Sequence, residues 1–296
     1  MMYSHEHISA YSFMVLVRKE YRNRPHERDE LQSLLQSLVE RYNSPVYLMM
    51  SKRNNIPLSH FSLLSRSVYP IVFEEFLSAG HYINCAIARI TEPYCCVIWS
   101  DMVADLHLDE KLTRWLLIHE PLCAAPILYD NTQHLIPTIT SPLSYSAPDI
   151  KTMAVPPGSD GDHTLYPFDY VGIYDTAKIK RMDGFDTDFE QGYWQLCDFG
   201  FSSWLRGEKI TGCNGILYEY NSQPPVEDHT ATKHGKRFRA KHFGYTIGPS
   251  GSVELTRRQR NQMPPSFINV YLSSPAKVVM EGDELISRWE THSENL

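Results

Sequence analysis

The sequence predicts an open α/β fold in which helices flank a mostly parallel sheet. Apolar, partly β-branched runs of strand length recur along the first 130 residues, and amphipathic stretches separate them. Of the 296 residues, 42% are hydrophobic and 21% are charged, which is typical of a folded globular protein. In such folds, ligands bind beyond the carboxyl ends of the strands. Functional side chains are therefore expected where the strands end.

The chain opens with a predicted strand, helix and second strand. Residues 11–20, YSFMVLVRKE, begin with an apolar run that suits a buried parallel strand. Residues 26–42 place an apolar side chain at every third or fourth position from Leu31 to Leu38, which predicts an amphipathic helix. Residues 45–50, PVYLMM, read as the second strand. We expect a right-handed crossover between the two strands.

The alternation continues through the middle of the chain. Residues 73–90 are helix-like in two pieces, and residues 92–101 form a hydrophobic strand that ends abruptly in polar residues. Residues 108–120 predict a helix and residues 123–130 another strand. Because residues 141–167 are rich in Pro, Ser, Gly and Asp, we expect a long loop there.

Charge and cysteine content narrow the classes of function and location. The net charge of −7 argues against nucleic acid as the main partner, since such binding relies on clustered Lys and Arg. The six cysteines contain no C-x-x-C pair, and the first residues show no secretory pattern, so we expect reduced thiols and a cytoplasmic location. No segment approaches the roughly 20 apolar residues of a membrane helix, so any membrane contact is expected to be peripheral.

The C-terminal part differs in character from the rest of the chain. Residues 231–260 contain eight basic and one acidic side chain, a net charge of +7, and the last sixteen residues are acidic. We therefore predict a main domain over residues 1–220 and a C-terminal extension over residues 221–296 that packs on it. The basic run is either a solvated face or a binding surface.

Asp101 is the first candidate for a functional residue. The strand over residues 92–101 delivers it to the carboxyl edge of the sheet, and Asp105 follows about one turn later. A carboxylate at this place can bind a hard divalent cation such as Mg²⁺ and, through it, a diphosphate. Asp also often caps a turn, so position alone leaves both readings open.

Asp198 is the second candidate, in the stretch DGFDTDFEQGYWQLCDFGFSSWLRGEKI over residues 183–210. The pattern predicts a turn and then a helix that begins near Asp198 and ends before Gly207. As an N-cap, Asp198 stabilises the helix by about 1 kcal/mol. Beside Trp194 and Phe199, its carboxylate is expected to be desolvated, to have a raised pKa, and to serve as a general base. The two readings are compatible.

His229 is a weaker candidate, in the polar segment PVEDHTATKH. Imidazole is a frequent metal ligand, but the chain has 13 histidines, which favours a chance occurrence over a ligand when this residue is taken alone.

Several common motifs are absent. The sequence has no G-x-G-x-x-G after the first strand, no G-x-x-x-x-G-K-[ST], no H-E-x-x-H and no G-x-S-x-G. This removes the main reasons to propose a dinucleotide enzyme, a P-loop NTPase, a zincin or a serine hydrolase. Diphosphate and sugar chemistry remains.

Taken in order, these segments resemble the family 2 glycosyltransferases, which have a GT-A fold, over about residues 11–230. The stretch quoted above looks like the family segment with a G-F-D-E-like turn, aromatics, an E-D pair, a helix with Arg, and a Gly. Cys197-Asp198 matches the E-D pair, Arg206 the helix Arg, and Gly207 the Gly. The resemblance implies that Asp198 is the catalytic base.

A second part of the resemblance lies upstream. CCVIWSD looks like the strand that ends in the family's D-x-D motif, which binds the metal and the donor diphosphate. Here the triplet is Trp99-Ser100-Asp101, so Trp replaces the first acidic residue. Asn84 matches an Asn-x-Gly/Ala-Ile pattern before that strand, and His229 falls where several members have a late metal-supporting His.

The resemblance implies a GT-A-like fold with a C-terminal extension, and transfer of a sugar from a nucleoside diphosphate sugar to a hydroxyl of a glycan or other acceptor, with inversion. It implies Mg²⁺ or Mn²⁺ as the cofactor, with Asp101 and His229 as ligands. Because Trp99 replaces one acid, basic residues of the C-terminal run are expected to share the binding of the diphosphate. The expected donor-binding residues are Tyr21, Asn23, Asn84, Ser100, Asp101, Arg206, Lys236 and Arg237.

Two other classes of protein compete with this one. A sugar-1-phosphate nucleotidyltransferase has a similar scaffold but needs a Gly-rich loop after the first strand, and VLVRKEYRNR contains no Gly. A catalytically inactive glycosyltransferase-like module that binds nucleotide, glycan or a partner protein stays open because of Trp99 and Cys197. The predicted loop over residues 141–167 is either an acceptor-side lid or disordered.

Overall fold

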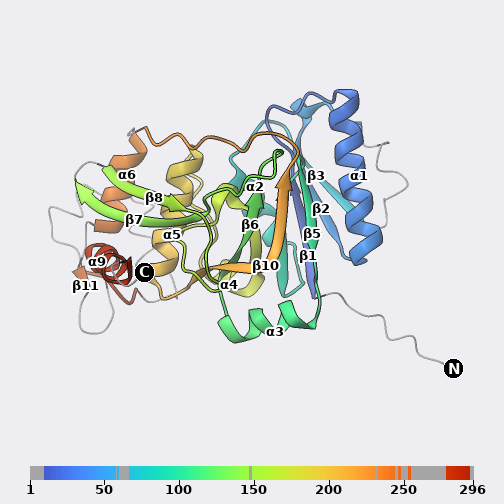
Figure 1. The fold of residues 1–296 in the computed structure, drawn as a ribbon. Coiled ribbons are helices and arrows are strands. Elements are labelled where there is room, and N and C mark those ends of the chain that lie inside the picture. The colour runs from blue at the N-terminus through green and yellow to red at the C-terminus, as the bar shows by residue number, and fades with distance from the viewer. Residues whose placement is uncertain are drawn as a thin grey trace.

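Strands and helices alternate along most of the chain and build a sheet with helices on both faces (Figure 1). The structure is a computed structural model that describes residues 10–57, 59, 67–146, 149–230, 233–243, 246–247, 253–254 and 278–293. The strands are β1 (Tyr11–Leu16), β2 (Val46–Ser51), β3 (Val68–Phe73), β4 (Tyr94–Trp99), β5 (Met102–Leu106), β6 (Cys123–Tyr129), β7 (Ile139–Ser146), β8 (Asp149–Val155), β9 (Gly172–Asp175), β10 (Ile210–Tyr220), β11 (Thr246–Ile247) and β12 (Val253–Glu254). The helices are α1 (Pro25–Tyr42), α2 (Ala79–Ile87), α3 (Glu110–His119), α4 (Thr176–Arg181), α5 (Gly192–Leu205), α6 (Lys233–Phe243) and α9 (Gly282–Ser293), with the short 3₁₀ helices η1 (Lys52–Asn54) and η3 (Phe168–Tyr170).

The main sheet has eight strands in the order β3-β2-β1-β4-β9-β6-β10-β5. Four of its seven neighbouring pairs are parallel, while β9 and the edge strand β5 run antiparallel to their neighbours. This confirms the predicted open, mostly parallel α/β class. Because β1 lies between β2 and β4, the strand order reverses between β1 and β4. Ligands of such sheets bind beyond the carboxyl ends of the strands at this reversal.

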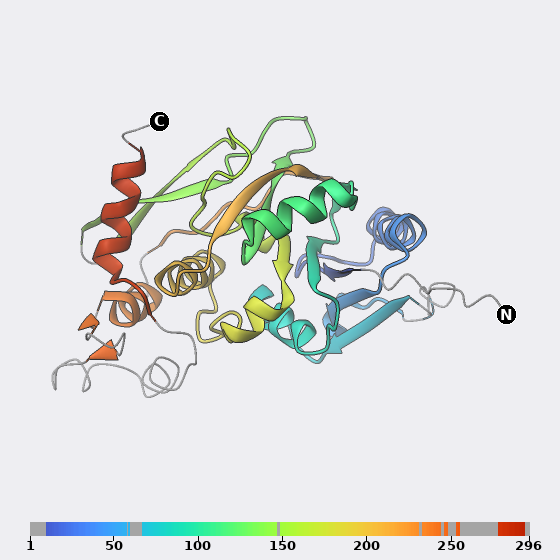
Figure 2. The same ribbon diagram turned by 90° about the horizontal axis from the view of Figure 1, so that it is seen from below.

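The opening β-α-β unit forms as the sequence predicts. Pro25 begins α1, where its missing N–H costs no helix hydrogen bond. The carboxylate of Glu27 accepts hydrogen bonds from the backbone N–H groups of Arg22 and Arg24 and so caps the first turn. The leucines of its apolar stripe are buried against the sheet, and Asn43 ends the helix in the left-handed region with φ of 48°. Figure 2 shows α1 and α3 on one face of the sheet and α2 and α4 on the other.

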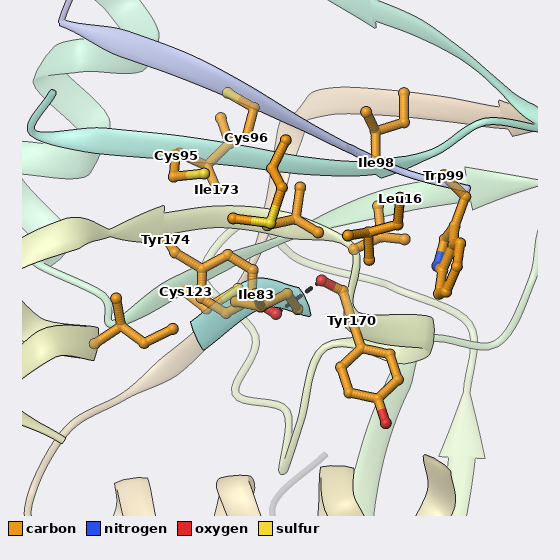
Figure 3. Close-up of a cluster of buried hydrophobic side chains, with 14 of the residues drawn as sticks. Leu16, Ile83, Cys95, Cys96, Ile98, Trp99, Cys123, Tyr170, Ile173 and Tyr174 are labelled. Atoms are coloured by element: carbon orange, nitrogen blue, oxygen red, sulfur yellow. Dashed lines mark hydrogen bonds between the residues drawn. The ribbon is translucent and has the colours of Figure 1, made fainter. Parts of the chain in front are cut away.

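The central strands are buried on both faces. Figure 3 shows side chains of β1 and β4, among them Leu16, Cys96 and Ile98, packed beside Tyr170 and Tyr174. The hydroxyl of Tyr174 donates to the backbone oxygen of Tyr170 at 2.8 Å, so this buried polar group is satisfied. A close-packed core of this kind fixes the side chains that follow the strand ends.

Two expectations for the middle of the chain were wrong. The first half of residues 141–167 belongs to the antiparallel hairpin of β7 and β8 rather than to a loop. The presence of Pro142 argued against a strand in the sequence. In the structure it lies at a shift in the pairing register, a position where a strand tolerates proline. Residues 73–90 contain one helix, α2, rather than two: Phe73 is the last residue of β3, and α2 begins only after Ser78, whose side chain caps it.

The C-terminal helices pack on the main fold. Both α6 and α9 contact α5, and α9 also contacts β7. The indole Nε1–H of Trp289 donates to Ser141 Oγ at 3.0 Å. The predicted boundary at residue 220 stays a prediction. Within the described residues, none of the helices has both the length and the apolar character that crossing a membrane requires. From the basic run, Arg257, Arg258 and Arg260 lie outside the described residues.

Candidate functional site

A cavity of about 340 Å³ opens beyond the carboxyl ends of β1 and β4. The segment after β1, the first turns of α1, the turn after β4 and the residues after β10 form its walls. The backbone N–H of Asn221 donates to the backbone oxygen of Asp101 at 2.8 Å, which ties two of these walls together. The cavity therefore lies at the reversal of strand order, where the fold class places ligands. Its lining residues are Arg18, Glu20, Tyr21, His26, Glu27, Glu30, Ser100, Asp101, Asn221 and Ser222.

Arg18 joins two carboxylates beside this cavity. Its Nε–H lies 3.1 Å from both carboxylate oxygens of Asp101. Its terminal nitrogens donate to the two oxygens of Asp169, at 3.3 and 2.7 Å. The guanidinium also lies 3.9 Å from the ring centre of Trp99, within the range of a cation–π contact. Arg18 is thus an internal cation held in a fixed orientation, with its side chain 16% exposed.

Asp169 anchors the other side of this ion cluster. It has a φ of 51°, in the left-handed region, within η3. Its backbone oxygen accepts a hydrogen bond from Trp99 Nε1–H at 2.8 Å, and its carboxylate accepts one from the hydroxyl of Tyr220 at 2.8 Å. Burial raises the pKa of Asp169, and Arg18 and Tyr220 oppose that rise. Trp99, the replacement in the D-x-D-like triplet, therefore both stacks on Arg18 and holds the turn that carries Asp169.

The side chains around Asp101 do not fit a resident Mg²⁺ or Mn²⁺ ion. In enzymes that act on phosphates, such ions are held by one or two protein carboxylates together with waters and substrate phosphates, and here both oxygens of the one candidate carboxylate, Asp101, accept from Arg18. Across the described ranges, no three or more His, Cys, Asp or Glu side chains come together in a way that could hold a metal. The predicted partner His229 lies 3.2 Å from Glu227 and is not among the residues that line this cavity.

The structure brings Tyr21, Ser100 and Asp101 together at the cavity, as their predicted role in donor binding requires. The Tyr21 side chain is buried, and its hydroxyl makes no hydrogen bond within the described residues. Burial raises the pKa of Tyr21 to about 12, so the hydroxyl keeps its proton at neutral pH. A buried hydroxyl without a partner is uncommon in proteins and marks a place for a ligand or water.

The two predicted asparagines hold loops in place. Asn23 has a φ of 55° and donates from its amide to the backbone oxygen of Asn55 at 2.8 Å. Asn84 binds both backbone groups of Phe185, at 2.8 and 2.9 Å. Neither side chain lines the cavity, so their donor-binding role stays a prediction.

Two of the three predicted basic residues, Arg206 and Arg237, have partners elsewhere. Arg206 is buried at the end of α5 and donates to the backbone oxygen of Met182 at 3.2 Å. Arg237 forms ion pairs with Asp186 and Asp188. Lys236 is exposed on α6. Their role at the diphosphate stays a prediction.

Asp198 lies in the interior of α5 rather than at its start. The helix begins at Gly192, and the Asp198 side chain is 2% exposed. One carboxylate oxygen lies 2.8 Å from Lys241 Nζ and the other 2.8 Å from His242 Nε2. Burial alone would raise the pKa of Asp198, but Lys241 and His242 outweigh it and lower the pKa. The expected raised pKa was therefore wrong. The ion pairs support a role in holding α6 against α5, and the base role stays a prediction.

Sequence reasoning placed the start of α5 too late because Asp and Gly usually mark turns. Gly200 does not mark a turn but lies inside α5. The helix needs glycine at this position because a Cβ there would come 2.2 Å from the backbone oxygen of Leu165. Arg18, Asp169 and Tyr220 were missed because their contacts join distant parts of the sequence. The available signal was Arg18 itself, the first charge after a buried strand.

Comparison with known proteins extends the description of the fold. No protein-family model matches the sequence, and no curated protein does. GalNAc-T7, solved with UDP, GalNAc and Mn²⁺, is similar with a TM-score of 0.60 and 11% identity, over 97% of this chain and 55% of its own. TarS residues 1–349 from S. aureus, solved with UDP, is similar with a TM-score of 0.50 and 13% identity, over 88% of this chain and 78% of its own. The chain thus spans about half the length of GalNAc-T7. These likenesses establish that the chain has a GT-A fold, as the sequence resemblance implied.

Proposed function

We propose that this GT-A-fold chain is a glycosyltransferase that moves a sugar from a nucleoside diphosphate sugar to an acceptor hydroxyl, with inversion. The observation that carries the proposal is the cavity at the strand-order reversal, lined by Tyr21, Ser100 and Asp101. The structural neighbours support a nucleoside diphosphate donor, because GalNAc-T7 and TarS were solved with UDP; inversion rests on the sequence resemblance alone. The structural similarity to these two proteins establishes the fold only, because one fold can host many functions; the reaction is our proposal.

The walls of the cavity suit the nucleoside half of the donor. The cavity lining includes the cation of Arg18 and four carboxylates, so its walls are mainly negative; the carboxylates belong to Glu20, Glu27, Glu30 and Asp101. Carboxylates accept hydrogen bonds from ribose hydroxyls and base N–H groups, but they repel phosphates. Tyr21 adds an unpaired hydroxyl at the same place. We therefore place the nucleoside in this cavity, with the diphosphate directed towards Arg18.

The chemistry then needs one bond to form and one to break. The acceptor oxygen bonds to the anomeric carbon, the bond from that carbon to the β-phosphate oxygen breaks, and the nucleoside diphosphate leaves with the bonding electrons. Arg18 retains N–H donors beyond those it gives to Asp101 and Asp169, so it can stabilise negative charge that develops nearby. Because Asp101 is occupied by Arg18, no step of this proposal passes through a metal ion.

A second candidate function is supported by the same ion cluster. The two carboxylates that surround Arg18 offset its charge, and a nucleotide or glycan can bind such a fold without turnover. The chain would then be a catalytically inactive, glycosyltransferase-like binding module. Nucleotide binding without release of nucleotide from any sugar donor distinguishes this candidate from the enzyme.

A thermal-shift panel of UDP, GDP, CDP and dTDP, each with and without Mn²⁺, tests the proposal. A ligand that binds only the folded state at a hundredfold excess over its Kd stabilises the protein by about 2.7 kcal/mol. We expect one nucleotide to raise the Tm of the wild type and, if Tyr21→Phe binds it about tenfold more weakly, to keep about half of that stabilisation in the variant. If no nucleotide raises the Tm of the wild type, the donor cavity is rejected.

A further inference from the structure

Arg18 gives only part of its hydrogen-bonding capacity to the two carboxylates that hold it. A guanidinium group has five N–H donors in one plane. The single Nε–H is shared between the two oxygens of Asp101, and each terminal nitrogen donates one hydrogen to Asp169. Within the described residues, one N–H on each terminal nitrogen is therefore left for another acceptor.

Arg18 presents this remaining capacity at the donor cavity. Both Arg18 and Asp101 line the cavity, whereas Asp169 does not and is buried, with its side chain 9% exposed. Asp169 thus holds the guanidinium from the buried side. Arg18 is also the only Lys or Arg among the residues that line the cavity. A phosphate group that enters there meets this one fixed cation.

The contacts around Arg18 hold it in place before any ligand binds. The guanidinium carbon lies 3.9 Å from the ring centre of Trp99 and 5.8 Å from that of Tyr220. Both aromatic side chains also donate hydrogen bonds to Asp169, at 2.8 Å each. Figure 3 shows Trp99 at the end of its strand, beside Leu16. An oriented charge of this kind costs little further ordering when a ligand binds.

Arg18 and a divalent ion exclude each other at Asp101. An ion that binds this carboxylate has to take an oxygen to which Nε–H now donates, because Nε lies 3.1 Å from both oxygens. The guanidinium cannot withdraw freely, since Asp169 and Trp99 hold its other sides. Two cations at one carboxylate also repel each other. The place that the sequence resemblance assigns to a metal ion is therefore filled by a protein cation.

We infer that the guanidinium of Arg18 takes the place of a divalent metal ion at the donor diphosphate, an inference that rests on the proposed function. The ligand is a nucleoside diphosphate, or its sugar ester, that binds without metal. Its phosphate oxygens accept the two remaining N–H groups, because planar paired donors match two oxygens of a phosphate. Trp99, Asp169 and Tyr220 are positioning residues that keep the guanidinium at the cavity.

Asp101 then orients Arg18 instead of binding a metal. Its oxygens accept from Nε–H, but its negative charge opposes that of the phosphates. An asparagine at this position still offers one oxygen to Nε–H and removes the charge. The two accounts therefore differ in sign for Asp101→Asn: a metal site loses its ligand, whereas an Arg18 site loses a repulsive neighbour.

Calorimetric titration of UDP and of uridine, each in EDTA and in millimolar Mn²⁺, tests the inference. If the thermal-shift panel identifies another nucleoside diphosphate, that compound and its nucleoside take their place. We expect the wild type to bind UDP with a Kd that is equal within about threefold in the two conditions, and Asp101→Asn to bind it at least as tightly.

Two substitutions separate a contact with the diphosphate from a general effect on the cavity. Arg18→Lys keeps a cation beside Asp169 but removes the planar pair of donors. It is expected to weaken UDP binding at least about tenfold and uridine binding by less than about threefold, because uridine has no phosphate. The matched control is Lys19→Ala, which removes the adjacent, exposed cation that does not line the cavity. It is expected to leave both affinities unchanged.

The outcomes distinguish this inference from the function on which it rests. UDP binding that is at least about tenfold weaker in EDTA than in Mn²⁺, or equally weaker in Asp101→Asn, overturns the role of Arg18 alone. Equal weakening of UDP and uridine in Arg18→Lys also overturns it, because the effect then belongs to the shape of the cavity. A wild type that binds none of the four nucleoside diphosphates in either condition overturns the proposed function, and the inference with it.

Discussion

Replacing Asp198 by Asn tests whether this residue holds the fold together. The substitution preserves the shape of the side chain but removes the charge that balances Lys241. Both partners are buried, with side chains 2% and 8% exposed, so water cannot replace the lost ion pair. Removing one partner of a buried ion pair costs about 3–5 kcal/mol. We expect a loss of this size in the free energy of unfolding at neutral pH.

The pH dependence gives an independent check of the same cluster. The pKa of Asp198 is lowered in the folded protein relative to its ordinary value of 3.8. Its contribution to stability is therefore complete above that value and is lost as the pH falls through the folded pKa. The difference in stability between wild type and Asp198→Asn is expected to shrink as the pH falls below about 4.

Urea denaturation followed by tryptophan fluorescence measures these effects. The control is Asp188→Asn, because Asp188 pairs with Arg237 but is 54% exposed. Exposed ion pairs contribute about 0–1 kcal/mol, so this variant is expected to unfold almost like the wild type. If Asp198→Asn loses less than about 1 kcal/mol yet abolishes sugar transfer, the structural account is refuted and the predicted base role of Asp198 is supported.

Three further substitutions test other parts of the account. Arg18→Ala leaves Asp169 buried without its cation and is expected to cost about 3–5 kcal/mol of unfolding free energy at pH 7. Without Arg18, burial raises the pKa of Asp169 further, and a carboxyl group with a raised pKa in the folded state destabilises the protein more as the pH rises. The loss measured by urea titration is therefore expected to be smaller at pH 5, and a pH-independent loss contradicts this. Gly184→Ala places a Cβ 2.1 Å from Asn84 Oδ1 at a φ of +67°. It is expected to lower the free energy of unfolding by at least about 2 kcal/mol, against about 1 kcal/mol for the roomier Gly207→Ala, and equal losses argue against the close contact. Tyr21→Phe removes a hydroxyl that has no partner, so it is expected to change stability by less than about 1 kcal/mol and to weaken UDP binding about tenfold by calorimetry; unchanged binding excludes Tyr21 from the site.

Local patterns in the sequence predicted the parts of the fold that depend on neighbouring residues. The spacing of leucines in α1 and the apolar runs of β1 and β4 follow from burial against one sheet. Asp101 was found for the same reason, because a polar residue directly after a buried strand has to lie at the edge of the sheet. Gly207 follows α5 with φ of +79°, as a glycine after a helix end often does.

The remaining parts depend on contacts between distant residues. Nothing near Arg18 indicates that Asp169 meets it across 151 positions of sequence. From its neighbours in sequence alone, Asp198 resembled the first residue of a helix. Its actual partners, Lys241 and His242, belong to a helix more than forty residues later, and local patterns do not reveal them. Pro142 made residues 141–146 look unlike a strand. The strand tolerates this proline because it lies at a shift in the pairing register of the β7–β8 hairpin, which the sequence does not show. Burial and pairing, which decide whether a carboxylate is a base or a structural ion, are properties of the folded chain.

Calorimetric titration of UDP into the wild type, Ser222→Trp and Ser33→Trp tests the donor cavity most directly. Ser222 lines the cavity, whereas Ser33 is exposed on α1 outside it, so the two variants add the same bulk at different places. The account predicts that the wild type and Ser33→Trp bind UDP, or another of the four nucleoside diphosphates, with equal affinity and that Ser222→Trp does not. Equal binding by Ser222→Trp, or no binding by the wild type to any of the four, contradicts it.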